Sequence, residues 1–179
     1  DKVSKRVKAL KVGDPLDPTS NMGSMISRKH LSTVDGFIQK GIDEGAKLLL
    51  GGVSNKDQKG FYAKPTLFDN LEQDMTIAQE EIFGPVLGVL TFNDEAEALK
   101  IASNSKYGLC ASVFTQDIDK AFHFAKNLPC GTVSVNTFSE GDIKTPFGGY
   151  KQSGSLSRDQ GTEALNQYLQ TKTIWISHS

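Results

Sequence analysis

The stretch Gln79-Glu-Glu-Ile-Phe-Gly-Pro-Val86 separates a short amphipathic segment from a long apolar one. Gly84-Pro85 ends a helix, and proline is well tolerated at the first position of a strand. Glu81 and Phe83 therefore fall on a connector that is held at both ends by regular structure. A carboxylate that accepts hydroxyl hydrogen bonds, with a ring two residues away, could hold a polar ligand that contains a ring. A solvated glutamate beside a core phenylalanine is the alternative interpretation.

The clearest regular pattern follows Pro85. Apolar segments at 86–92, 109–115 and 131–136 alternate with two amphipathic helical segments. This alternation predicts an α/β fold with a parallel-stranded sheet and right-handed crossover helices. Because ligands collect beyond the C-terminal ends of parallel strands, Asn136 and the loop after it are predicted to lie at a functional edge.

The sequence before Pro85 predicts two helices and two short strands. The first helix is basic, and its lysines read as a solvated face rather than a phosphate-binding patch. The second helix, at 28–43, carries an apolar stripe that we expect to be buried: Leu31, Val34, Phe37, Ile38 and Ile42. Residues 46–50 predict a buried strand. Residues 61–68 predict an edge strand, because Pro65 interrupts them.

Composition limits the classes of function. The chain has 179 residues, 37% of them hydrophobic and 23% charged, with a net charge of -1, which is typical of a soluble globular domain. Near-neutral charge gives no reason to expect nucleic acid or membranes as partners. Two cysteines make no disulfide framework, which fits a cytoplasmic location. The chain starts without Met inside a helix, so we expect it to be a fragment of a longer protein.

No catalytic set can be assembled from these residues. Cys110 lies in an apolar strand and Cys130 at a turn, so both are predicted to be structural and slow to react with thiol reagents. The histidines are scattered, and no pair of Cys or His has metal-ligand spacing. The Gly-rich segment 147–154 matches neither phosphate-binding glycine motif. Its glycines instead predict a tight backbone path.

Five motifs resemble the aldehyde dehydrogenase superfamily in order and spacing. The central one is the stretch quoted above, and its counterpart in the family is Glu-Glu-Ile-Phe-Gly-Pro-Val. The others are Val12-Gly-Asp-Pro-Leu-Asp-Pro18, Gly60-Phe-Tyr-Ala-Lys-Pro-Thr-Leu67, Tyr107-Gly-Leu-Cys-Ala-Ser-Val-Phe114, and Val135-Asn136 with Thr145-Pro-Phe-Gly-Gly-Tyr-Lys-Gln-Ser-Gly154.

The resemblance implies the C-terminal part of the catalytic domain of an enzyme that oxidises aldehydes with NAD or NADP. Residues 1–136 would belong to that domain, 137–170 would form a substrate-tunnel loop and the following helix, and 171–179 an oligomerisation strand. The nucleophilic cysteine, the general-base glutamate and the cofactor domain would lie upstream, so the chain alone is predicted to be inactive. The rival interpretation is a self-standing α/β binding or assembly module without catalysis.

The resemblance also assigns roles to individual residues. Glu81 would bind the nicotinamide ribose and Phe83 would pack near the nicotinamide. Phe147 would line the substrate tunnel, and so would Ser139, Glu140 and Gly141, the last replacing an aromatic residue found in many relatives.

Two acids, Glu140 and Asp142, flank Gly141, and they favour an aldehyde that bears an amine or a guanidine. The C-terminal run Lys172-Thr-Ile-Trp-Ile-Ser177 and the Gly141-Asp142 pair look closest to the aminobutyraldehyde branch, including the γ-glutamyl-aminobutyraldehyde enzymes. Solvated loop acids are the alternative.

Residues 171–176 are apolar and β-rich. From the residues alone, they could equally join this chain's own sheet or pair with another chain. In the family the final strand extends a neighbour's sheet, which implies a homo-oligomer.

Overall fold

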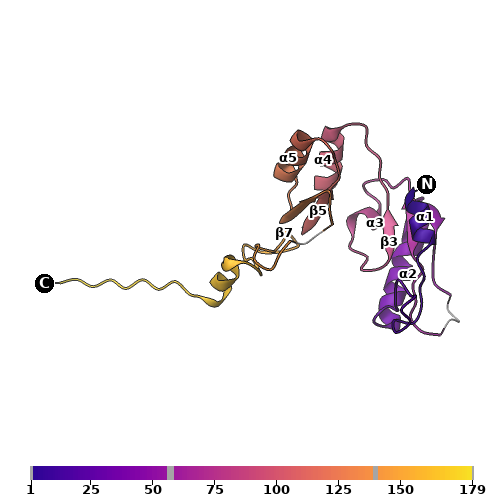
Figure 1. Ribbon diagram of the computed structural model, residues 1–179, viewed down its shortest axis with the longest axis horizontal. Helices are drawn as coiled ribbons and strands as arrows, with labels where there is room; N and C mark the ends of the chain where they lie inside the picture. The colour runs from indigo at the N-terminus through magenta and orange to yellow at the C-terminus, as the bar shows by residue number, and fades with distance from the viewer. Residues whose placement is uncertain (1, 56–58, 139–140, 179) are drawn as a thin grey trace. The chain divides into compact units, whose positions relative to one another are not determined.

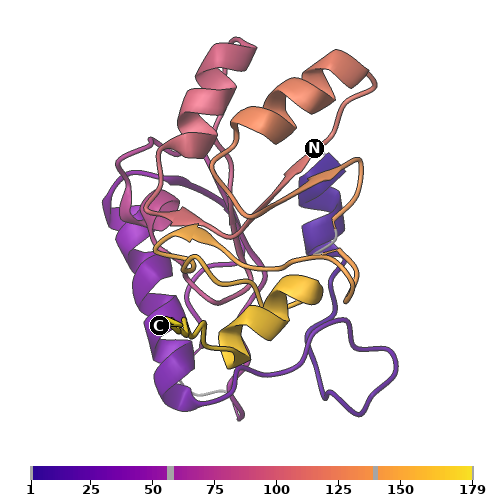
Figure 2. The same ribbon diagram turned by 90° about the vertical axis from the view of Figure 1, so that its left-hand side faces the viewer.

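The computed structural model describes residues 2–55, 59–138 and 141–178, and the chain divides into two units, residues 1–93 and 94–179 (Figure 1). The elements of the first unit, in chain order, are α1 (Lys2–Lys8), α2 (Arg28–Asp43), β1 (Lys47–Leu50), β2 (Thr66–Asp69), α3 (Thr76–Gln79) and β3 (Val86–Gly88). A wide loop joins α1 to α2, the long purple helix in Figure 2. The two helices predicted in this region are confirmed.

The first unit contains a three-stranded sheet in the order β1-β2-β3. β2 is antiparallel to β1 and parallel to β3. The prediction that 61–68 is an edge strand is therefore wrong, because β2 is the central strand. Pro65 comes just before the first residue of β2, and the Thr66 amide donates to the Pro85 carbonyl at 2.8 Å. Because Pro65 lies outside β2, its missing N–H removes no hydrogen bond between the strands of the sheet.

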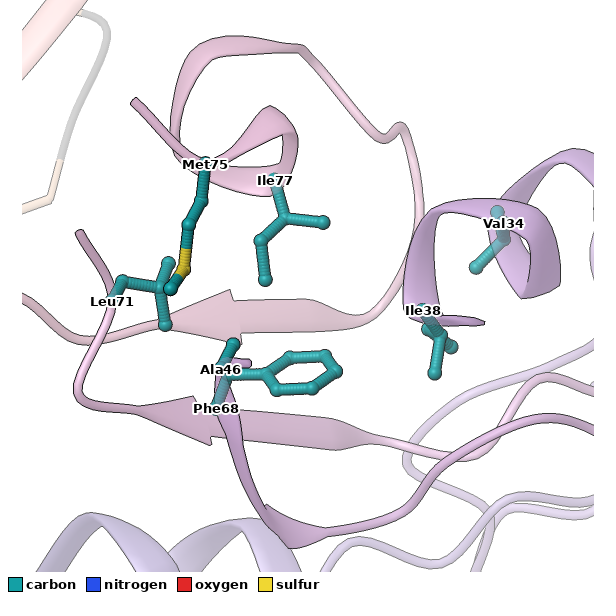
Figure 3. Close-up of a cluster of buried hydrophobic side chains, with 7 residues drawn as sticks. All are labelled: Val34, Ile38, Ala46, Phe68, Leu71, Met75 and Ile77. Atoms are coloured by element: carbon teal, nitrogen blue, oxygen red, sulfur yellow. The ribbon is translucent and has the colours of Figure 1, made fainter. Parts of the chain in front are cut away.

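The core of the first unit lies between α2, α3 and the sheet. Figure 3 shows the apolar side chains that form it: Val34, Ile38, Ala46, Phe68, Leu71, Met75 and Ile77. The α2 stripe is confirmed for Leu31, Val34 and Ile38, which are buried. Ile42 is 37% exposed, against expectation.

The reason for the exposure of Ile42 is the position of α3. A Cβ on Gly41 would lie 2.6 Å from Cδ1 of Ile77, so α3 packs over Gly41. Ile42, the next residue of the helix, therefore points away from α3. β1 is also less buried than predicted, with Leu48 and Leu49 each 38% exposed, because it is an edge of the sheet.

The second unit contains a parallel strand pair joined by a helix. Its elements are α4 (Glu95–Ser103), β4 (Tyr107–Gly108), β5 (Cys110–Val113), α5 (Ile118–Asn127), β6 (Thr132–Val135), β7 (Tyr150–Lys151) and the 3-10 helix η1 (Thr162–Tyr168). β5 and β6 are parallel, as predicted, with α5 as the crossover. β3, however, pairs with β2, so the three predicted parallel strands do not form one ladder in the part of the chain described.

The apolar stripe of α5 is only partly covered. Ala121 and Leu128 are buried, but Ile118 is 65% exposed and Phe122 57% exposed. A two-stranded sheet of four-residue strands is too narrow to cover the whole stripe, and parallel sheets normally have both faces covered.

The C-terminal residues join no sheet. Residues 171–176, within the yellow end of the chain in Figure 1, form no strand with any of the described residues. Ile174, Trp175 and Ile176 are 73%, 90% and 76% exposed. None of the helices in the described ranges is long and apolar enough to cross a membrane.

Candidate functional site

The connector between α3 and β3 carries the two predicted cofactor contacts, Glu81 and Phe83. Phe83 has φ of 54°, which lies in the left-handed region that side chains other than glycine rarely adopt. Its ring is 75% exposed, so the interpretation of Phe83 as a core residue is wrong. Glu81 is also exposed.

The connector borders an open depression of about 360 Å³. The residues that line it are Ile77, Glu80, Glu81, Ile82, Phe83, Gly84 and Val86. Glu81 and Phe83 therefore line the same depression, where a carboxylate and an aromatic ring lie beside apolar side chains. This combination suits a ligand that has both hydroxyl groups and a flat ring.

Two contacts with α2 hold the connector. Nε2 of His30 lies 2.7 Å from the carbonyl oxygen of Phe83. Gly84 lies directly against Val34, which is fully buried. The His30 contact could not be predicted from the sequence, because 53 residues separate the partners. The only available signal was the i, i+4 spacing of His30 and Val34 on one face of the helix.

Glu44, at the C-terminal end of α2, holds the start of α3. Its Oε2 accepts from the Thr76 amide at 2.7 Å, and its Oε1 accepts from the Thr76 hydroxyl at 2.6 Å. These bonds, above all the one from the hydroxyl, lower the pKa of the Glu44 carboxyl below its usual range. Because α3 leads directly into the connector, Glu44 helps to position it.

The predicted substrate residues belong to the second unit. Ser139 and Glu140 lie outside the described residues. Gly141 has φ of 97°, a conformation in which an aromatic side chain would be strained. Backbone geometry thus favours glycine at this position.

Asp142 is exposed at the start of a tight turn. Its Oδ1 accepts from the Lys144 amide at 2.8 Å, and its carbonyl accepts from the Thr145 hydroxyl at 2.7 Å and from the Thr145 amide at 2.8 Å. The turn orders the carboxylate while leaving it on the surface. An exposed carboxylate is compatible with both interpretations of Asp142, as a contact for the substrate and as a solvated loop acid.

Asn136 lies at the C-terminal ends of β5 and β6, as predicted. Its Oδ1 accepts from the Thr115 amide at 2.9 Å, and its Nδ2 donates to the Thr115 carbonyl at 2.8 Å. Its φ of 56° turns the chain away from the strand. The asparagine side chain therefore extends the pairing of the two strands and fixes where the loop after β6 begins.

The Gly-rich segment after this loop is a tight structural turn. Phe147 is half-buried, and its carbonyl accepts from the Asp159 amide at 2.7 Å. A Cβ on Gly154 would lie 2.5 Å from the carbonyl oxygen of Gly149, which confirms the predicted tight backbone path.

Lys151 in the same segment has a role that sequence reasoning missed. Its Nζ donates to the carbonyls of Ser103 and Ser105 at 2.8 Å each, and so caps the end of α4.

The two cysteines differ in their surroundings. Burial is the main cause that raises the pKa of the Cys130 thiol, which fits a structural role. Cys110, in contrast, is exposed on β5, so burial gives no reason for the slow reaction with thiol reagents that was predicted for it. Across 2–55, 59–138 and 141–178, no three His, Cys, Asp or Glu residues are placed to hold a metal ion.

The chain is similar to several known enzymes. It is 44% identical to 4-trimethylaminobutyraldehyde dehydrogenase A of Danio rerio, over 98% of this chain and 35% of that protein. It is 41% identical to betaine aldehyde dehydrogenase of Brucella anthropi, over 98% of this chain and 37% of that protein. The chain thus spans about a third of the length of these curated relatives.

A solved relative agrees with the sequence matches. The crystal structure of Mycobacterium tuberculosis aldehyde dehydrogenase complexed with NAD+ is 43% identical, with a TM-score of 0.89 over 94% of this chain and 35% of that one. Residues 1–174 match the family model described as "Aldehyde dehydrogenase family". With its fold, its motifs and nearly its whole length in agreement, the chain belongs to the aldehyde dehydrogenase family.

Proposed function

We propose that this chain supplies cofactor and substrate contacts within an NAD(P)-dependent aldehyde dehydrogenase. The observation that carries the proposal is the connector, on which Glu81 and Phe83 border one open depression. In this proposal the Glu81 carboxylate accepts hydrogen bonds from the ribose hydroxyls, and the Phe83 ring packs beside the nicotinamide. The cofactor, when bound, accepts the hydride that leaves the aldehyde carbon.

The nucleophile is proposed to come from outside these 179 residues. Burial raises the pKa of the Cys130 thiol, which disfavours the thiolate that a nucleophile needs. Cys110 lies within strand β5, not on the connector that carries Glu81 and Phe83. The chain alone is therefore expected to reduce no NAD or NADP when an aldehyde is added.

We further propose an aldehyde that bears a positive charge. Asp142 presents an exposed carboxylate, and the neighbouring Gly141 adds no side chain beside it. The names of the Danio rerio and Brucella anthropi relatives support this class of substrate, since both indicate a quaternary ammonium aldehyde. Glu140 is proposed to add a second negative charge, and Ser139 and Phe147 to complete the wall of the tunnel.

The C-terminal residues are proposed to form an interface between subunits of a homo-oligomer. Three consecutive large apolar side chains, Ile174, Trp175 and Ile176, are all mostly exposed. Such a run is unfavourable in water and invites strand pairing with another chain. We also propose that the enzyme is cytoplasmic.

The first test is to sequence the coding region upstream of Asp1. A further few hundred codons with a cysteine a short way before Asp1 would support the proposal. A start codon just ahead of Asp1 would instead favour the rival function, a self-standing binding or assembly module without catalysis.

The second test uses the longer enzyme. Glu81→Gln and Phe83→Ala should each raise KM for the cofactor, with Glu72→Gln and Phe92→Ala as matched controls outside the depression. Cofactor KM values that stay unchanged in both site variants would contradict the proposed contacts.

The charge of the substrate is tested separately. Replacing Glu140 by Gln and Asp142 by Asn should raise KM for a trimethylammonium aldehyde and leave KM for a neutral aldehyde of equal length unchanged. An equal rise for both aldehydes would favour the interpretation of Glu140 and Asp142 as solvated loop acids.

A further inference from the structure

We infer that His30 is a positioning residue for the connector, and that its imidazole holds Phe83 in the conformation that presents the ring. Nε2 of His30 lies 2.7 Å from the Phe83 carbonyl oxygen. A carbonyl oxygen can only accept a hydrogen bond, so this nitrogen must carry the proton. The contact thus identifies Nε2 as the imidazole nitrogen that carries a hydrogen.

The local structure of α2 places the imidazole at this carbonyl. Ser27 caps the helix, and its Oγ accepts from the His30 amide at 3.1 Å, which fixes the backbone of the first turn. Val34 follows one helical turn later on the same face and packs against Gly84. Two adjacent residues of the connector are therefore held by two adjacent turns of α2.

Phe83 needs such a contact because its own side chain does not anchor it. The left-handed conformation is unfavourable for a phenylalanine, and its ring is 75% exposed, so little packing compensates. The hydrogen bond to the backbone carbonyl is a contact that favours this conformation without covering the ring. The ring is thus available for a ligand while the backbone stays fixed.

This role rests on the proposed function at one point only, the identity of the ligand. If Glu81 and Phe83 bind the cofactor, His30 acts on cofactor affinity through Phe83 and does not itself touch the cofactor. Loss of one hydrogen bond is expected to weaken cofactor binding about fivefold.

The first experiment measures the backbone of Phe83 by NMR in the 179-residue chain. A positive φ brings the amide and Hα protons of one residue together, so unchanged Phe83 should show a strong NOE between them. His30→Leu should weaken this NOE. His30→Gln should keep it, because the glutamine side chain also ends in an N–H donor. Lys29→Leu, an exposed change in the same helical turn, should leave the NOE unchanged.

A strong NOE in His30→Leu would overturn the inference. Should that variant fail to fold, the unchanged chain still provides a test. A correlation spectrum of the imidazole nitrogens should show the proton on Nε2 of His30, and an unprotonated Nε2 would overturn the inference as well.

The second experiment separates the inference from the proposed function. In the longer enzyme, His30→Leu should raise KM for NAD about fivefold, and His30→Gln should restore it. A change in the Phe83 NOE without any change in KM would support the positioning role and contradict the cofactor role of Phe83. A change in KM without a change in the NOE would overturn the positioning role.

Discussion

Gly84 on the connector and Val34 on α2 are in direct contact. A Cβ on Gly84 would lie 2.7 Å from Cγ2 of Val34 and 2.8 Å from its Cγ1. Val34 is fully buried and β-branched, so its methyl groups have little freedom to move aside. The glycine therefore sets how closely the connector can approach the helix.

This contact predicts the effect of Gly84→Ala. The extra methyl group should lower the free energy of unfolding by about 1–3 kcal/mol, the usual cost of overpacking. In the Val34→Ala background the same change should cost at least about 1 kcal/mol less, because the space is then open. Urea unfolding of the four chains of this double-mutant cycle measures the coupling. Additive effects of the two changes would contradict the proposed contact.

The bonds between Glu44 and Thr76 predict a dependence of stability on pH. The pKa of Glu44 is lowered in the folded chain, chiefly by the bond from the Thr76 hydroxyl. The stabilisation is therefore complete above the unfolded pKa, about 4.3 for a glutamate, and is lost as pH falls through the lower folded pKa. Glu44→Gln should thus destabilise the chain at pH 7 and make progressively less difference below about pH 4.

Chemical unfolding at several pH values tests this prediction. Asp43→Asn is a control with the same change in charge, since the Asp43 side chain bonds to Gln39 of its own helix rather than to α3. If Glu44→Gln destabilised the chain by the same amount from pH 7 to pH 3, the charge of Glu44 would not be the source of the stabilisation.

Local patterns in the sequence predicted most individual elements. The prediction of α2 at 28–43 follows from the helical spacing of Leu31, Val34 and Ile38. The pairing of β5 with β6 follows from the alternation of strand and helix. The partner of β3 could not be predicted in this way, because pairing with β2 depends on contacts between distant residues rather than on a local period.

The sequence proposes residues for the candidate site but does not predict their geometry. The motif identified Glu81 and Phe83, and the Gly84-Pro85 pair placed them on a connector. The left-handed backbone of Phe83 and its bond from His30 could not be predicted, since a phenylalanine gives no sign of positive φ. Conformations of this kind are imposed by the surrounding fold.

The side chain of Asn136 is expected to contribute measurably to the stability of the second unit. Asn136→Ala removes both hydrogen bonds to Thr115 and puts alanine at a φ of 56°. The expected loss is about 3 kcal/mol, from two hydrogen bonds of about 1 kcal/mol each and about 1 kcal/mol for the left-handed backbone. Asn136→Gly loses the same bonds without the strain, so it should cost about 1 kcal/mol less than the alanine variant. Thermal unfolding of both variants measures the difference, and a glycine variant less stable than the alanine variant would contradict it.

The two cysteines are expected to react with a thiol reagent at different rates. Cys110 is exposed, whereas Cys130 is half-buried and the pKa of its thiol is raised by burial. Less thiolate is then present on Cys130 at neutral pH, so iodoacetamide should label Cys110 several times faster. Raising the pH should speed the labelling of Cys130, because its thiolate then forms.

Mass spectrometry of peptides taken during labelling identifies each cysteine. Cys110→Ser should remove the fast phase, and Cys130→Ser should remove only the slow one. Faster labelling of Cys130 at neutral pH would contradict the raised pKa of its thiol. It would also revive Cys130 as a candidate nucleophile, and with it the possibility that this chain has chemistry of its own.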